Sequence, residues 1–244
     1  MKKKNISKLN SCLIITTVIS LITLIIMTVL YINSENKESE TKLETYYQNK
    51  CYSYEIQNKN LSKGQIVFIG DSITDGYHLD DYYVDLDFAT YNRGISGDIT
   101  TGLKARLKVS VFDITPSKVV IMIGVNDILR GGNVDDITNR YDSILASIYE
   151  ELPEVEIYIL SVLPQNEEVV KKVKVEVTQT MSKTKELNEN LESLAIKYDT
   201  TYIDLFTHFL DETGYLNSDY TYDGLHLNSE GYTLWTSILK DYLK

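Results

Sequence analysis

The chain has 244 residues, enough for one α/β domain with a sizeable core and a small additional segment. Its formal net charge is -11 at pH 7, with 35 acidic and 24 basic residues. Nucleic-acid binding depends on neutralising phosphates with lysine and arginine, so this composition argues against a nucleic-acid partner.

The N-terminal segment has the properties of a membrane anchor. Residues 11–32 contain no charged side chain and are rich in leucine and isoleucine, and about 20 such residues in a helix span a bilayer. All four lysines of this region, at positions 2, 3, 4 and 8, precede the apolar run. Because lysine-rich flanks stay in the cytoplasm, we expect a cytoplasmic segment at 1–10, a transmembrane anchor at 11–32 and an extracellular remainder.

A cleaved signal peptide, which would release a secreted protein, is the alternative. Such peptides usually have a shorter apolar region and a small-x-small cleavage site, and residues 30–34 (Leu-Tyr-Ile-Asn-Ser) offer none. The sequence therefore favours the uncleaved anchor. With Cys12 in the anchor and Cys51 beyond it, the outer domain is expected to fold without a disulfide.

Residues 33–63 are polar and are interpreted as a stalk, with one helix around 38–49. From residue 64 onward, short apolar runs alternate with helical patterns. The runs that read as strands are 65–69, 118–123 and 155–162, with weaker candidates at 88–92 and 201–205. The helical patterns cover 99–109, 134–152, 183–198 and 230–243. Such alternation predicts a parallel sheet covered by helices on both faces, with ligands bound beyond the carboxyl ends of the strands.

Residues 166–181 are highly charged, with lysines and glutamates close together. A solvated helix or loop is the favoured interpretation. A functional lid over a cleft is the alternative.

Ser72 follows the first expected strand within the run Gly70-Asp71-Ser72-Ile73-Thr74. A serine at the carboxyl end of a strand is placed for catalysis, and free backbone N–H groups of a following helix can stabilise an oxyanion. Taken alone, such a serine is also a common helix N-cap. The Gly-x-Ser-x-Gly elbow of another hydrolase class is absent.

Two further motifs follow the next strands. The run Gly94-Ile95-Ser96-Gly97-Asp98 has glycines that allow a tight turn and close approach to a ligand. In Gly124-Val125-Asn126-Asp127, the Asn126 amide is placed to donate a hydrogen bond into the same cleft, while Asp127 suits a helix cap. Each motif is weak alone, but all three lie at the carboxyl ends of strands.

A base for the serine is found near the C-terminus. His226, one of the three histidines, has an aspartate, Asp223, three residues before it. A serine hydroxyl becomes a good nucleophile when a histidine removes its proton and a carboxylate fixes the histidine tautomer. His78 and His208 are interpreted as structural.

In order and in kind, residues 64–244 resemble the SGNH, or GDSL-type, hydrolases, and the forms Asn-Arg-Gly-Ile-Ser-Gly and Asp-Gly-Leu-His-Leu-Asn are most similar to the platelet-activating-factor acetylhydrolase-like and carbohydrate acetylesterase branch. The resemblance implies a three-layer α/β/α sandwich with a flavodoxin-like parallel sheet. It implies a triad of Ser72, Asp223 and His226, and an oxyanion hole formed by Ser72, Gly97 and Asn126. Members of this branch tend to act on short acyl groups, often acetyl.

The sequence thus predicts a serine esterase that hydrolyses short-chain esters of a carbohydrate or small molecule, without cofactor or metal. A cell-wall sugar O-acetyltransferase with the same triad is the first alternative. A catalytically silent surface-binding module and a long-chain lipase are more remote. Tyr77, Tyr82, Tyr83, Tyr220 and Tyr222 lie near the motifs and are interpreted as packing residues, with a sugar site as the alternative. The alcohol part of the substrate and the oligomeric state are not specified by the sequence.

Overall fold

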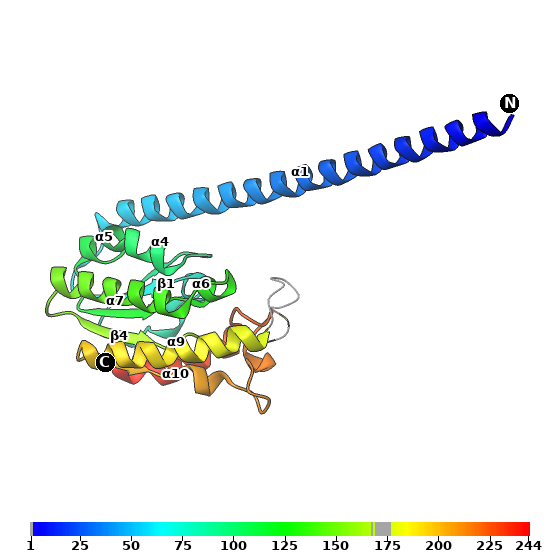
Figure 1. Ribbon diagram of the computed structural model, residues 1–244. Coiled ribbons are helices and arrows are strands. Elements are labelled where there is room, and N and C mark those ends of the chain that lie inside the picture. The colour runs from blue at the N-terminus through cyan, green and yellow to red at the C-terminus, as the bar shows by residue number, and fades with distance from the viewer. Residues whose placement is uncertain (1, 167, 169–176) are drawn as a thin grey trace. The chain divides into compact units, whose positions relative to one another are not determined.

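The computed structural model describes residues 2–166, 168 and 177–244, which form two compact units, residues 1–48 and residues 49–244 (Figure 1). The charged stretch that raised the alternative of a lid lies largely outside the described residues. The second unit begins at Asn49, upstream of the expected domain start at residue 64.

Helix α1 (Lys2–Asn58) is continuous, whereas the sequence predicted an anchor helix at 11–32 and a separate short helix at 38–49. No proline or glycine precedes Gly64, so nothing in this stretch interrupts a helix. Pairs at i,i+4 spacing add support, with Lys42 Nζ 2.7 Å from Glu38 Oε1. The part of α1 from Ile19 is long and apolar enough to cross a membrane, a property that signal sequences share, and its aliphatic side chains between Ile19 and Ile32 are exposed.

A parallel sheet forms the centre of the second unit. Its strands are β1 (Ile66–Gly70), β2 (Thr90–Gly94), β3 (Lys118–Met122), β4 (Glu156–Leu160) and β5 (Thr201–Ile203). Their order is β2-β1-β3-β4-β5, and every neighbouring pair is parallel. This is the flavodoxin-like order, so the predicted fold class is confirmed.

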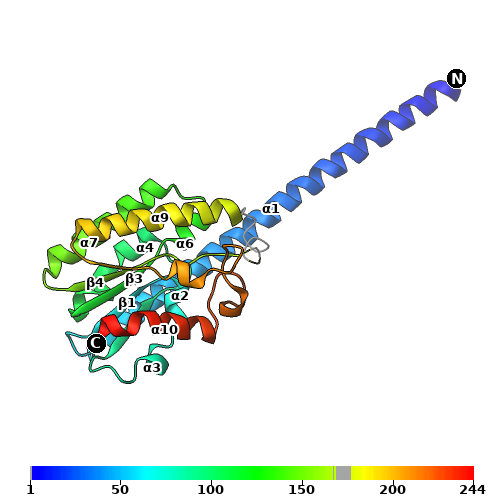
Figure 2. The same ribbon diagram turned by 90° about the horizontal axis from the view of Figure 1, so that it is seen from below.

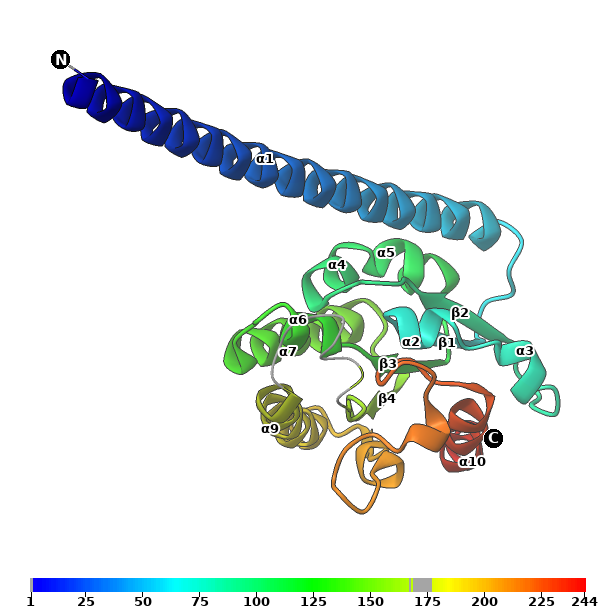
Figure 3. The same cartoon turned by 90° about the vertical axis from the view of Figure 1, so that its right-hand side faces the viewer.

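Helices cover both faces of this sheet. The longer ones are α7 (Val134–Glu151), α9 (Val177–Lys197) and α10 (Ser229–Leu243), and the shorter ones are α2 (Ser72–Asp75), α3 (Leu79–Tyr82), α4 (Thr100–Ala105), α5 (Leu107–Ser110) and α6 (Val125–Leu129). Figures 2 and 3 show α7 and α9 on one face of the sheet, with α3 and α10 on the other. The helix expected at 99–109 is divided at Arg106 into α4 and α5.

Strand β1 lies between β2 and β3, and all five of its residues are buried. This explains its continuous apolar sequence, because a central parallel strand has helices against both faces. Trp235 of α10 and Tyr141 of α7, helices on opposite faces of the sheet (Figure 2), are fully buried in the hydrophobic core. The sheet therefore holds the carboxyl ends of β1, β2 and β3 in fixed positions beside one another.

Helix α2 approaches β2 unusually closely at Gly94. A Cβ atom at Gly94 would lie 2.2 Å from Asp75 N and 2.7 Å from Thr74 C, which are backbone atoms. Only glycine allows this contact, and Gly94 donates its N–H to Asn92 Oδ1 at 2.8 Å. The side-chain amide of Asn92 in turn donates to the carbonyls of Thr74 (2.6 Å) and Tyr77 (2.8 Å), which fastens the end of α2 to β2.

Gly94→Ala should therefore lower the free energy of unfolding by about 3 kcal/mol or more, because backbone has to move. Gly214→Ala is the matched control, since nothing lies within 4 Å of its added Cβ and the cost comes only from φ +83°, about 1 kcal/mol. Urea unfolding followed by the fluorescence of Trp235, the single tryptophan, measures both. Equal losses in the two variants would contradict the close approach.

Candidate active site

Ser72 is the first residue of α2 and is separated from the end of β1 by Asp71 alone. The Asp71 side chain caps α2 by accepting a hydrogen bond from Ile73 N at 3.0 Å. The turn is therefore built by the residue beside Ser72, and the Ser72 hydroxyl remains available to other groups.

The structure brings Ser72, His226 and Asp223 together in a hydrogen-bonded series. Ser72 Oγ lies 2.9 Å from His226 Nε2, and His226 Nδ1 lies 2.8 Å from Asp223 Oδ2. A carboxylate accepts only, so it holds the proton of a neutral imidazole on Nδ1 and leaves Nε2 as the acceptor that faces the serine. The His226 and Asp223 side chains are 28% and 11% exposed, so the series opens to solvent at the imidazole.

The loop before α10 fixes the geometry of Asp223 and His226. Asp223 Oδ1 accepts from His226 N at 2.8 Å and from Leu225 N at 3.1 Å. Thr221 Oγ1 donates to the His226 carbonyl at 2.7 Å and accepts from Gly224 N at 2.9 Å. Both ends of the loop are thus held by side chains within it, so the aspartate and the imidazole cannot easily separate.

Gly97 and Asn126 follow the strands on either side of β1. Gly97, with φ +77°, lies in the loop after β2, and its carbonyl accepts from Arg130 Nη2 at 2.7 Å. Asn126 lies at the start of α6, after β3, and its Nδ2 donates to the Asp98 carbonyl at 3.0 Å. Asn126 is therefore hydrogen-bonded to the same loop that carries Gly97.

Comparison with known proteins adds an independent finding. Residues 68–234 match the model of the GDSL-like Lipase/Acylhydrolase family. The chain belongs to this family. It is therefore an acylhydrolase, a class of ester hydrolases, as the resemblance of its motifs predicted.

Three relatives illustrate the match. A solved structure of a proposed platelet activating factor from Streptococcus pneumonia is 31% identical and has a TM-score of 0.79, over 85% of this chain and 97% of that one. An acetylxylan esterase from Geobacillus stearothermophilus is 36% identical over an alignment of 89 residues, and the match covers 27% of this chain and 41% of the relative's length. The crystal structure of Axe2, an acetylxylan esterase of that organism, is 21% identical with a TM-score of 0.60, over 74% of this chain and 94% of that one, which bears on the fold alone.

A group of buried charges lies behind the site of this acylhydrolase, and the sequence did not reveal it. Arg106 donates to Asp98 Oδ2 at 2.7 Å, to the Arg93 carbonyl at 2.7 Å and to the Gly70 carbonyl at 2.9 Å. Asp127 was expected to cap its own helix. Instead its carboxylate accepts from Thr100 N at 3.0 Å, and so it caps α4. No local pattern signals these contacts, because each joins residues from different elements.

The aromatic residues divide into two groups. Tyr77 and Tyr83 are buried and their hydroxyls are 3.0 Å apart, as the packing interpretation expects. Tyr222 differs from that expectation: the residue is 71% exposed, and its ring stacks on the His226 ring, with centroids 5.8 Å apart. His78 and His208 are exposed, and the structure does not bring them into the series that contains His226.

Among the described residues, no group of three or more His, Cys, Asp or Glu side chains is arranged to hold a metal ion.

The carboxyl group of Asp71 has an unusual acidity. Burial raises the pKa of Asp71 from its ordinary 3.8 to about 7; the charges of Asp98 and Asp127 add to the rise, while the Ile73 N–H and the Arg106 guanidinium oppose it. A folded-state pKa above the unfolded value means that the protonated carboxyl stabilises the fold. This contribution is fully present below about pH 4 and is lost as the pH rises through about 7.

Asp71→Asn should remove this titration while it retains an oxygen that accepts from Ile73 N. Between pH 4.5 and pH 8 the free energy of unfolding of the variant should therefore gain about 3 kcal/mol relative to the wild type. Urea unfolding at several pH values measures the difference. Parallel profiles for the two proteins would contradict a raised pKa at this position.

Proposed function

We propose that this acylhydrolase is a serine esterase that removes short acyl groups, chiefly acetyl, from a carbohydrate or another small alcohol. The observation that carries the proposal is the series Ser72 Oγ–His226 Nε2 and His226 Nδ1–Asp223 Oδ2, at 2.9 and 2.8 Å. This is the arrangement in which an imidazole takes a proton from serine. The acetylxylan esterase relative supports acetyl esters of sugars as the substrate class.

In the proposed reaction His226 Nε2 takes the Ser72 proton while Oγ attacks the ester carbonyl carbon. The tetrahedral intermediate collapses, and His226 returns the proton to the departing alcohol. Water then attacks the acyl-serine with the same base, which releases the acid and restores Ser72. Asp223 holds the imidazole in the required tautomer and stabilises it while it carries the extra proton.

The oxyanion would be stabilised by the backbone N–H groups of Ser72 and Gly97 and by the side-chain amide of Asn126. The amide carries two N–H bonds, and one of them is donated to the Asp98 carbonyl. The other has no hydrogen-bond partner among the described residues and can donate to the substrate. This internal hydrogen bond also fixes the orientation of the amide. Losing one oxyanion donor typically costs about 10²–10³ in rate.

We further propose that α1 anchors the enzyme in the membrane, with the cytoplasmic segment at 1–10, the span at 11–32 and the hydrolase domain outside the cell. The exposed aliphatic side chains of α1 support this, because their burial in lipid would remove a large apolar surface from water. The lysines before the span support the orientation.

The first test is turnover of p-nitrophenyl acetate, butyrate and octanoate by the full chain in detergent. We expect the rate to fall with acyl length, and Ser72→Ala to abolish turnover because the nucleophile is gone. Ser237→Ala, an exposed serine of α10, is the control and should retain full activity. Wild-type rates in Ser72→Ala would overturn the nucleophile, and a stoichiometric burst without turnover would indicate an acyltransferase that requires an acceptor.

The role of Asp223 is tested by Asp223→Asn. The amide oxygen can still accept from His226 N, but an NH₂ group opposite Nδ1 cannot accept its proton, so the wrong tautomer is favoured. We expect kcat to fall by about 10³–10⁴-fold, with an unchanged circular dichroism spectrum. Asp219→Asn, an exposed acid in the same region, is the matched control. An undiminished kcat in Asp223→Asn would show that another group orients His226.

A further inference from the structure

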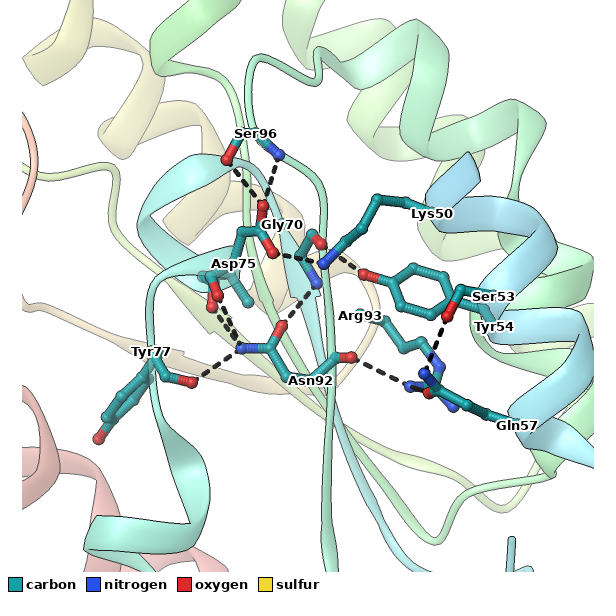
Figure 4. Close-up of polar contacts among 12 residues, drawn as sticks. Lys50, Ser53, Tyr54, Gln57, Gly70, Asp75, Tyr77, Asn92, Arg93 and Ser96 are labelled. Carbon is teal, nitrogen blue, oxygen red and sulfur yellow. Dashed lines mark hydrogen bonds and ion pairs between the residues drawn. The ribbon is translucent and has the colours of Figure 1, made fainter. Parts of the chain in front are cut away.

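The end of α1 is hydrogen-bonded to β2 and to the last residue of α2 (Figure 4). Lys50 Nζ lies 2.6 Å from Asp75 Oδ1, and Tyr54 Oη donates to the Gly94 carbonyl at 2.5 Å. Burial raises the pKa of Tyr54, so its hydroxyl keeps the proton that it donates. These residues belong to the same compact unit as the sheet.

Arg93 provides a second attachment for the same helix. Its guanidinium donates to Gln57 Oε1 at 3.1 Å and to Asn58 Oδ1 at 2.9 Å, and it lies 4.5 Å from the centroid of the Tyr54 ring. Asn58 Nδ2 also donates to the Val109 carbonyl at 2.7 Å. The last turns of α1 are therefore held by several groups that do not involve Lys50.

Asp75 is the point at which three elements meet. It is the last residue of α2, the helix that Ser72 begins. One carboxylate oxygen accepts from Lys50, and the other accepts from Ser96 N at 3.1 Å and from Ser96 Oγ at 2.7 Å. Ser96 directly precedes Gly97 in the chain. A single carboxylate thus links the nucleophile helix, the Gly97 loop and α1.

We infer that Asp75 is a positioning residue of the esterase site and that Lys50 of α1 completes it. The inference rests on the proposed function, in which the Gly97 N–H stabilises the oxyanion. Asp75 fixes the peptide of Ser96, and with it the direction of the next N–H, relative to the helix that carries Ser72. The last turns of α1 are in this sense part of the catalytic apparatus.

The charge of Lys50 matters because of where Asp75 lies. The Asp75 side chain is 11% exposed and that of Lys50 is 27% exposed, so water screens the pair only partly. Without the ammonium group, the partly buried carboxylate is hydrated more favourably when it turns towards water. Its hydrogen bonds to Ser96 then weaken. A displacement of the oxyanion donor by a fraction of an ångström lowers transition-state stabilisation while it leaves ground-state binding nearly unchanged.

The test compares Lys50→Met with Lys42→Met in the full chain in detergent, with p-nitrophenyl acetate as substrate. Lys42 lies on the same helix and pairs with Glu38 at 2.7 Å, but both side chains of this pair are exposed, so Lys42 is a matched control. Lys50→Met should lower kcat about tenfold with KM unchanged within twofold. Lys42→Met should change neither quantity, and Lys50→Arg, which keeps the charge, should restore at least half of kcat.

A double-mutant cycle with Asp75→Asn separates positioning from general destabilisation. If Lys50 acts through Asp75, Lys50→Met should have little further effect on kcat once Asp75 is asparagine. Trp235 fluorescence during urea unfolding verifies that each variant is folded, and Ser96→Ala, which removes only the hydroxyl contact, provides a milder variant of the same link.

Wild-type kcat in Lys50→Met, or independent and additive effects of Lys50→Met and Asp75→Asn, would overturn the inference. Ser72→Ala measured in the same assay distinguishes the two levels of failure. An active Ser72→Ala would contradict the proposed function itself. An inactive Ser72→Ala together with a fully active Lys50→Met would contradict only the positioning role.

Discussion

The site depends on one buried cation. The Arg106 guanidinium is almost fully buried and binds the carbonyl of Gly70 at the end of β1, the carbonyl of Arg93 in β2 and the carboxylate of Asp98. An unpaired charge in this position would be prohibitively costly, whereas a fully hydrogen-bonded one holds its partners firmly. Ser72 lies two residues after Gly70, and Gly97 lies between Arg93 and Asp98 in the chain. The positions of the proposed nucleophile and of the proposed oxyanion donor are thus both linked to the Arg106 side chain.

Much of this arrangement follows from local sequence. Strand β1 was predictable because a parallel strand with helices on both faces has to be apolar at every position. The aspartate and histidine were predictable because a separation of three residues, closed by a turn at Gly224 with φ +85°, brings carboxylate and imidazole into contact within one loop. In both cases the physical cause and the sequence signal lie within a few residues of each other.

The rest depends on contacts between distant segments. Arg106 is one charged residue in a helical pattern. Nothing in the neighbouring sequence indicates that its side chain is buried and hydrogen-bonded to Gly70, Arg93 and Asp98. Asp127 caps a helix that precedes it by 27 positions. The polar composition of 33–63 suggested a stalk, yet Lys50, Tyr54 and Asn58 use their polar groups on the domain. A polar segment reads the same in a sequence whether its hydrogen bonds go to water or to protein.

The contacts that residues 50–58 make with the domain also determine how proteolytic cleavage of α1 affects the site. Residues 33–48 belong to the first compact unit and residues 50–58 to the second, so a cut before Asn49 would leave the contacts of Lys50 with Asp75 and of Tyr54 with Gly94 on the hydrolase domain. A cut between Asn58 and β1 would separate these contacting residues from the domain. Under the proposed membrane anchoring, the position of a cut therefore decides whether the released domain keeps the contacts that hold Asp75.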